Sequence, residues 1–199
     1  MKSSINFKAI YRLLDSVSPI DGDCGKLCGA ACCTCDNGQS EDALIKDARD
    51  DADYEMGIYL LPGEEDMFTG DETWVKWGHL AAEDFEFPES WTGNVAFLEC
   101  RVAPCCPRKK RPLQCRFYPL TPHIDYNNNL WLIYQKAESL PYVCPLIEDR
   151  IPLNESFMKA TYTVWKRLIQ DPLIYDMVEM DSDYRIEDGE EIEIVYPHI

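Results

Sequence analysis

The first clear pattern along the chain is a stripe of apolar residues near its start. Its members are three or four positions apart, which is the spacing of one face of an amphipathic helix. They are Phe7, Ile10, Leu14 and Val17. Ser3 or Ser4 is placed to cap the first turn, and Pro19 to end the helix.

The C-terminal third carries the same helical spacing more strongly. Asn154 is a favourable N-cap residue for a first helix. The apolar stripe of this helix consists of Phe157, Ala160, Val164 and Leu168. Asp171 followed by Pro172 then predicts the start of a second helix, because an acidic cap and a proline in the first turn both favour helix initiation. The apolar residues of this second helix are Leu173, Ile174, Met177 and Val178.

Between these helices the pattern changes to short apolar or alternating segments, which are typical of strands. A brief helix with acids in its first turn is expected over 64–68. The expected strands are 57–62, 74–80, 95–98, two strands within 118–134 around a turn at 125–129, and an edge strand near 192–196. The chain is therefore predicted to be an α+β protein with a small irregular sheet, flanked by an N-terminal helix and C-terminal helices. It has no internal repeat, so residues 1–199 are predicted to form one domain.

Two stretches lack this periodicity. Residues 21–40 are rich in glycine and cysteine, so we expect a loop shaped around something other than a hydrophobic face. Residues 41–55 form an acidic run, which predicts a solvated helix face or a loop.

Composition narrows the possible functions. The 199 residues include 19 Lys and Arg against 36 Asp and Glu, a formal net charge of −17, so phosphates of nucleic acid or of an anionic membrane would be repelled. No apolar run is long enough for a transmembrane helix, and charged residues interrupt the apolar positions of the N-terminus, which argues against a signal peptide. We therefore expect a cytoplasmic protein, in a compartment that keeps thiols reduced.

The ten cysteines are the main chemical feature. The first cluster holds Cys24, Cys28, Cys32, Cys33 and Cys35, the second holds Cys100, Cys105, Cys106 and Cys115, and Cys144 follows alone. Thiolates are strong ligands of zinc and of iron–sulfur clusters, which usually take four of them. Glycines beside the first cluster allow the backbone to approach a bound metal. Packing as small apolar residues or a disulfide scaffold are the alternatives, and the adjacent pairs and expected compartment disfavour disulfides.

A basic run beside the second cluster has two possible roles. It consists of Arg108, Lys109, Lys110, Arg111 and Arg116. These cations would stabilise thiolates, or they would form a solvated turn that pairs with the carboxylates of the chain. The three histidines, His79, His123 and His198, are isolated in the sequence and are not expected to be metal ligands.

The order of these motifs resembles the bacterial zinc- or iron-chelating cysteine-cluster family, called YkgJ-like and named for its CxxCxxCC pattern. The match begins in the C-x3-C-G-x-x-CC run and continues through Arg111-Pro112, the following Cys-Arg and Tyr118-Pro119. The segment 60–65 is also similar, so the resemblance covers a core of about residues 21–145. It implies eight metal ligands: Cys24, Cys28, Cys32, Cys33, Cys100, Cys106, Cys115 and Cys144.

The match departs from the family pattern at two spacings. One more residue separates Cys28 from Cys32 than the family name implies, and the interval from Cys100 to Cys106 is longer. Cys35 and Cys105 are then extra cysteines. Cys35 stays an alternative ligand to Cys33, and Cys105 stays an alternative ligand to Cys106.

Three functions follow from these features. The first is a metal-binding protein of unknown cellular role that holds zinc, which we favour because it needs no assembly machinery, or an iron–sulfur cluster. The second is a protein-modifying or redox enzyme with a cysteine-ligated iron–sulfur cluster, because the cysteine module is similar to that of flagellin lysine methylases. The chain shows no glycine-rich nucleotide loop and no catalytic triad, so no catalytic residue is assigned. The third is a module that binds a basic protein through its acidic surface.

Overall fold

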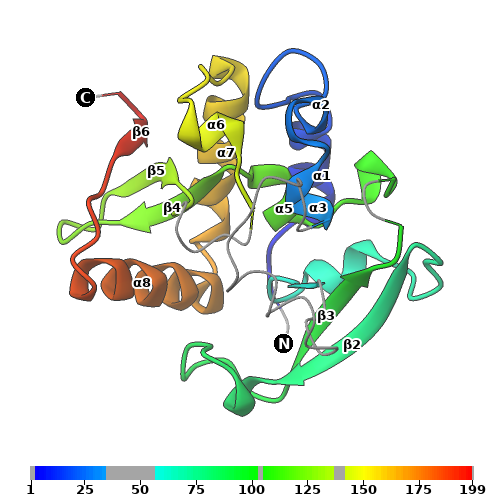
Figure 1. Cartoon of the computed structure of the whole chain (residues 1–199). Helices are drawn as coiled ribbons and strands as arrows, with labels where there is room; N and C mark the ends of the chain where they lie inside the picture. Colours follow the sequence, from blue (N-terminus) through cyan, green and yellow to red (C-terminus); the bar gives the residue numbers. More distant parts are fainter. Residues whose placement is uncertain (1–2, 35–56, 103–104, 137–141, 199) are drawn as a thin grey trace, which may run out of the picture.

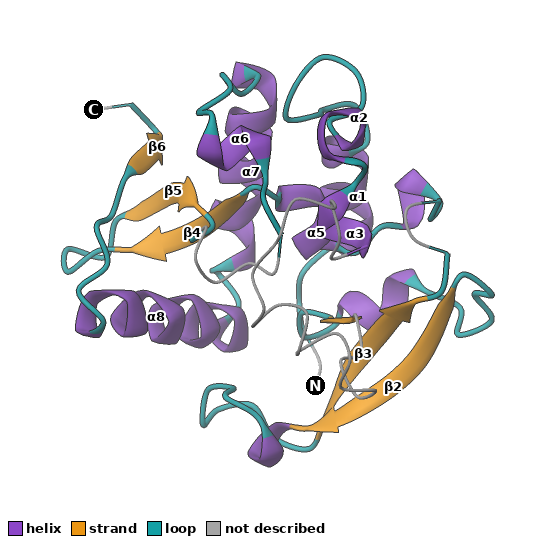
Figure 2. Ribbon diagram, viewed as in Figure 1, coloured by secondary structure: helices purple, strands orange, loops and turns teal. Residues whose placement is uncertain are grey.

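The computed structural model describes residues 3–34, 57–102, 105–136 and 142–198. It has two small antiparallel sheets together with helices, so the predicted α+β class is confirmed, whereas the prediction of one sheet is wrong (Figures 1 and 2). The acidic run at 41–55 lies outside the described residues. No helix in the described part of the chain is long and apolar enough to cross a membrane.

The first sheet is built by strands that are distant from the C-terminal helices in sequence. Its strand order is β1-β3-β2, with β1 at Gly57–Tyr59, β2 at Val75–Ala81 and β3 at Asn94–Cys100. Short 3-10 helices follow β1 and β2, namely η1 at Glu64–Met67 and η2 at Ala82–Asp84. The predicted brief helix after Pro62 is therefore confirmed as η1.

The second sheet has the order β4-β5-β6. A tight turn joins β4 (Leu120–Ile124) to β5 (Leu130–Tyr134), as predicted, and β6 (Ile194–Tyr196) pairs with β5 as the edge strand. Figure 1 shows α8 (Pro172–Glu187) running along this sheet, with α7 (Glu155–Leu168) packed close to it.

The three predicted helices are present, but the first ends at Leu14, before Val17 and Pro19, and the predicted caps are partly wrong. Helix α1 covers Phe7–Leu14, and Asn6, rather than Ser3 or Ser4, caps it by accepting a hydrogen bond from the amide of Ala9. Asp171 caps α8 as predicted, through the amide of Leu173 at 3.1 Å. Asn154 occupies the N-cap position of α7, but its side chain instead donates to the Ser18 carbonyl and the Asp21 carboxylate.

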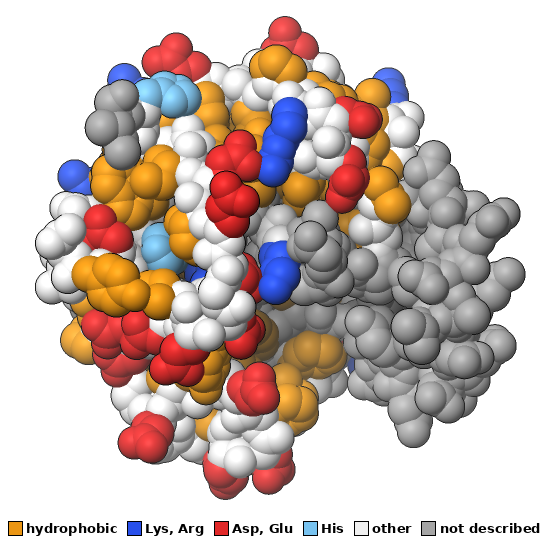
Figure 3. Space-filling view, turned by 60° about the vertical axis from the view of Figure 1, so that its left-hand side comes forward, with side chains coloured by type: hydrophobic (Ala, Val, Ile, Leu, Met, Phe, Trp, Pro, Cys, Tyr) orange, Lys and Arg blue, Asp and Glu red, His pale blue; other side chains and the backbone are white. Residues whose placement is uncertain are grey.

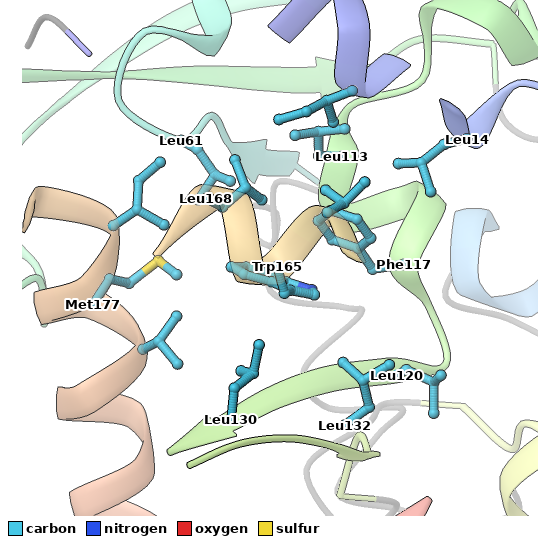
Figure 4. Close-up of a cluster of buried hydrophobic side chains, with 14 of the residues drawn as sticks. Leu14, Leu61, Leu113, Phe117, Leu120, Leu130, Leu132, Trp165, Leu168 and Met177 are labelled. Carbon is cyan, nitrogen blue, oxygen red and sulfur yellow. The ribbon is translucent and has the colours of Figure 1, made fainter. Parts of the chain in front are cut away.

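The main hydrophobic core joins segments from both ends of the chain. Leu14 of α1, Leu113 and Phe117 of α5 (Leu113–Phe117), and Trp165 of α7 all belong to it. Figure 4 shows Trp165 lying between Leu168 and the strands of the second sheet, beside Phe117. The rings of Phe117 and Trp165 have centroids 4.8 Å apart. The predicted apolar stripe of α7 is buried in this core: Phe157, Ala160, Val164 and Leu168.

Asp125 holds the turn between β4 and β5. Its carboxylate accepts hydrogen bonds from the amides of Asn127 and Asn129 at 2.8 and 2.9 Å and from the indole of Trp131 at 3.0 Å. These bonds, chiefly the one from the Asn129 side chain, lower the pKa of Asp125 well below its ordinary value. The turn is therefore stabilised by the ionised carboxylate.

We expect Asp125→Ala to lower the free energy of unfolding by about 1–2 kcal/mol at neutral pH, because several turn donors lose their acceptor. A lowered carboxyl pKa contributes stability that is present above the unfolded-state pKa of about 4 and is lost as the pH falls. The difference between wild type and variant should thus shrink in acid. Urea unfolding at pH 7 and pH 3 measures it, and an equal difference at both pH values would contradict this role.

Candidate metal centre

Three cysteines of the first cluster, Cys28, Cys32 and Cys33, lie on two short helices rather than in the predicted loop, and Cys24 is the N-cap residue of the first of these helices. Helix α2 covers Gly25–Cys28 and α3 covers Ala31–Thr34. Gly29 ends α2 in the left-handed conformation, with φ of 64°, which a glycine adopts without steric strain. The amide of Cys33 bonds to the Ala30 carbonyl at 2.7 Å and begins the next turn. The sharp reversal brings the cysteines of both helices to one cavity.

That first cavity has a volume of about 390 Å³. Its wall combines cysteines of the first cluster with residues far along the chain, among them Cys144, which directly precedes α6 (Pro145–Glu148). The cysteines in its wall are Cys24, Cys28, Cys32, Cys33, Cys105 and Cys144, and Arg111 lies among them. All of them are free thiols.

A second cavity, of about 590 Å³, adjoins the first. Cys32, Cys33 and Arg111 belong to the walls of both cavities, and Cys115 of α5 lines the second. The side chain of Cys106 is reached by the Arg111 guanidinium, whose Nε donates to Sγ at 3.2 Å. The two cysteine clusters therefore meet at Arg111.

Electrostatic effects indicate which thiols influence one another. Burial raises the pKa of Cys24, and the charges of Asp23, Cys28 and Cys144 raise it further. Burial also raises the pKa of Cys115 to about 12, followed by the charges of Cys33 and Cys106. Cys24 thus lies near Cys28 and Cys144, and Cys115 lies near Cys33 and Cys106. Cys32 is influenced most strongly by Cys33 and also by Cys24 and Cys28, so it links the two groups.

Cys33 differs from the other thiols. A hydrogen bond from Cys32 lowers the pKa of Cys33 to about 6, and the nearby charge of Arg111 lowers it as well. The same hydrogen bond raises the pKa of Cys32. Because only the thiolate is a strong metal ligand, Arg111 favours the ligating form on this side of the site.

The basic run serves both roles that the sequence left open. Arg111 contacts a thiol, whereas Arg116 pairs with Asp15 at 2.8 Å and lies over the ring of Tyr11, 4.3 Å from its centroid. Lys110 lies 3.7 Å from the Glu72 carboxylate. Of the described basic residues, Arg111 is therefore the one whose hydrogen bond reaches a cysteine.

Glu64 is a supporting residue whose role the sequence did not reveal. Its side chain is completely buried, and its carboxylate accepts hydrogen bonds from the Tyr11 hydroxyl at 2.6 Å, the Leu113 amide at 2.7 Å and the Leu61 amide at 3.1 Å. Burial raises the pKa of Glu64, and these three bonds oppose that shift. Leu113 begins α5, so Glu64 fixes the start of the helix that carries Cys115.

Gly63 allows Glu64 to turn inward. It has φ of 84°, and a Cβ at this position would lie 2.9 Å from Cβ of Ser3. The sequence indicated only acids near a helix start, because the partners of Glu64 are 53 and 49 positions away along the chain.

The predicted ligands divide as follows. Five of them, Cys24, Cys28, Cys32, Cys33 and Cys144, line the first cavity, Cys115 lines the second, and Cys106 contacts Arg111. Cys100 lies at the end of β3 opposite Val75 and is not among the described residues that line either cavity. Cys105 lines the first cavity, and Cys35 lies outside the described residues.

The thiols surround the cavities without closing on a common point. Among the described residues, no three His, Cys, Asp or Glu side chains are grouped tightly enough to hold a metal ion as they stand. None of the described lining residues is a histidine. The donor set is therefore all sulfur, which suits zinc or an iron–sulfur cluster and does not suit magnesium or calcium.

No family model, no curated protein and no solved structure matches this chain.

Proposed function

We propose that the protein binds metal through its cysteine thiolates and belongs with the YkgJ-like cysteine-cluster proteins that its sequence resembles. The observation that carries the proposal is the meeting of two distant cysteine clusters and Cys144 around adjoining cavities, with Arg111 between them. Unrelated apolar packing would place these thiols separately in the core, whereas among the nine described cysteines only Cys144 is buried.

Two groups of thiols support two centres. Cys24, Cys28, Cys32 and Cys144, which all line the first cavity, supply four sulfurs, the number that structural zinc and iron–sulfur sites use. Cys33, Cys106 and Cys115 supply three, and Arg111 beside them would offset part of the negative charge of the bound thiolates. The ligand role of Cys100 is supported only by the family resemblance.

Zinc is the favoured metal, and an iron–sulfur cluster is the alternative. A resident zinc ion would hold the thiolate-bearing segments together, which is a structural, storage or regulatory role. A cytoplasmic location fits this proposal, because a reducing compartment keeps the thiols available. The partner is the metal itself, and the surface charge disfavours nucleic acid and anionic membranes. Acidic side chains are scattered over the face drawn in Figure 3.

One observation favours the enzyme alternative. The second cavity extends away from Cys33 and Cys115, so a molecule bound there would lie beside the second thiol group. A cysteine-ligated cluster at this group would then be positioned for chemistry on that molecule, as the similarity to lysine methylases implies.

The test is purification without oxygen, followed by metal analysis and visible spectroscopy. We expect a colourless protein with at least one zinc per chain, and thermal unfolding at a lower temperature after treatment with a strong chelator. A brown protein that contains iron and sulfide in equal amounts would show that the bound group is an iron–sulfur cluster and not zinc. Protein that carries neither metal, and that takes up neither zinc nor iron when reduced, would refute metal binding.

A further inference from the structure

The second cavity has a charged end that metal binding does not use. On the side away from Cys33 and Cys115, its wall is formed by the α8 residues Met177, Asp181 and Arg185. These residues are four positions apart and therefore share one face of the helix. Between the two ends the wall includes the aromatic side chains of Tyr59, Phe117 and Trp165, together with polar residues such as Gln114 and Thr121.

Asp181 lacks the partners that a half-buried carboxylate normally has. Among the described residues it makes no hydrogen bond and no ion pair within 4.0 Å, although the charge of Arg185 reaches it. Burial raises the pKa of Asp181 accordingly. A carboxylate that is partly removed from water without a donor is unfavourable, so a ligand that brings a donor would bind there favourably.

Arg185 is held in place but retains N–H groups that no described residue accepts. Its Nη1 donates to the Pro122 carbonyl at 3.3 Å and its Nη2 to the Thr121 hydroxyl at 3.5 Å. A guanidinium has five N–H groups, so three are left for another acceptor. These contacts turn Arg185 toward β4 and explain why it does not pair closely with Asp181.

The two charges define the class of ligand. A simple cation at Asp181 would be repelled by Arg185, and a simple anion at Arg185 would be repelled by Asp181. A molecule with an ammonium and a carboxylate on adjacent atoms satisfies both groups and stays neutral overall. The apolar wall would then accept an apolar side chain, and about 590 Å³ is within the usual range for a small-molecule site.

We propose that the second cavity binds an apolar α-amino acid, with its ammonium at Asp181, its carboxylate at Arg185 and its side chain toward the cysteines. This site does not require a metal at the cysteines.

The experiment is isothermal titration of the full chain with L-leucine, N-acetyl-L-leucine and L-leucine methyl ester. We expect saturable binding of L-leucine and at least about tenfold weaker binding of each derivative, because a site built around a charged hydrogen bond rejects a ligand that lacks it. Asp181→Asn should weaken L-leucine about tenfold and remove most of the preference over the N-acetyl compound. Arg185→Gln should remove the preference over the ester.

Two controls keep the result specific. Asp183→Asn removes a negative charge at an exposed position of α8 and is the control for Asp181→Asn. Arg167→Gln removes a positive charge at an exposed position of α7 and is the control for Arg185→Gln. Both controls should bind L-leucine as wild type does. Asp181→Asn is expected to fold normally, because the Asp181 carboxylate makes no hydrogen bond to any of the described residues. The proposal is overturned if L-leucine, L-phenylalanine and L-methionine all fail to bind, or if Asp181→Asn binds L-leucine as tightly as Asp183→Asn does. Metal content is measured on the same samples, so loss of metal binding is recorded separately from loss of amino-acid binding.

Discussion

Glu64→Gln is expected to lower the free energy of unfolding of the metal-free protein by about 3 kcal/mol. All three groups that face the Glu64 carboxylate are donors: the Tyr11 hydroxyl and the amides of Leu61 and Leu113. A glutamine has only one acceptor oxygen, so its NH₂ group must face at least one of these donors in a site with no water contact. Both the donor and the NH₂ group then lose their hydrogen bonds.

The same substitution is expected to weaken metal binding, because Glu64 fixes the first residue of α5 and Cys115 is two positions further along. Asp66→Asn is the matched control, since Asp66 lies in the same turn of η1 and is exposed. Urea unfolding of chelator-treated protein and competition with a coloured chelator measure the two effects. An unfolding free energy equal to that of Asp66→Asn would show that Glu64 does not hold this helix.

Cys115→Ser is also expected to weaken metal binding, but without the loss of stability expected for Glu64→Gln. Its side chain lines the second cavity and does not belong to the main hydrophobic core, so exchanging sulfur for oxygen should leave the stability of the metal-free protein nearly unchanged. Metal affinity should fall about 100-fold, because about 10–16 kcal/mol of binding free energy shared among four ligands assigns roughly 3 kcal/mol to each. Stoichiometric metal analysis after dialysis against a buffered metal concentration measures this loss.

Cys35→Ser and Cys105→Ser are the companion variants. The assignment of Cys106 and Cys33 as ligands predicts that both variants keep wild-type metal content. Equal metal loss in Cys115→Ser and Cys35→Ser would refute the ligand assignment, and loss in Cys105→Ser would move the ligand role from Cys106 to its neighbour. Together with Glu64→Gln, this set separates a ligand from a residue that positions one.

The sequence predicted features that depend on nearby residues. Asp171 and Pro172 determine the start of α8 within one turn, and the stripe from Phe157 to Leu168 follows from helical spacing alone. The two one-turn helices around Gly29 were missed, because a single turn contains too few residues to show a period. The second sheet was also not separated from the first, since strand pairing between distant segments leaves no local pattern.

The candidate site shows the same limit. Clustered spacing and family resemblance indicated the cysteines, but not which of them face the same cavity. Cys144 lies near Cys24, and Cys33 lies near Cys115. These neighbours depend on how α3, α5 and the segment before α6 pack together. The charged end of the second cavity went unnoticed because Asp181 and Arg185 resemble an ordinary surface pair on a helix.

The contact between Phe117 and Trp165 has a consequence for how the protein is made. The ribosome synthesises the first cysteine cluster early, but Trp165, the aromatic partner of Phe117, emerges only with α7. All the described thiols that line the cavities are therefore translated before the core that supports Cys115 can form. We expect a nascent chain arrested before Trp165 to leave its cysteines open to alkylating reagents, and complete chains to acquire their metal only after synthesis.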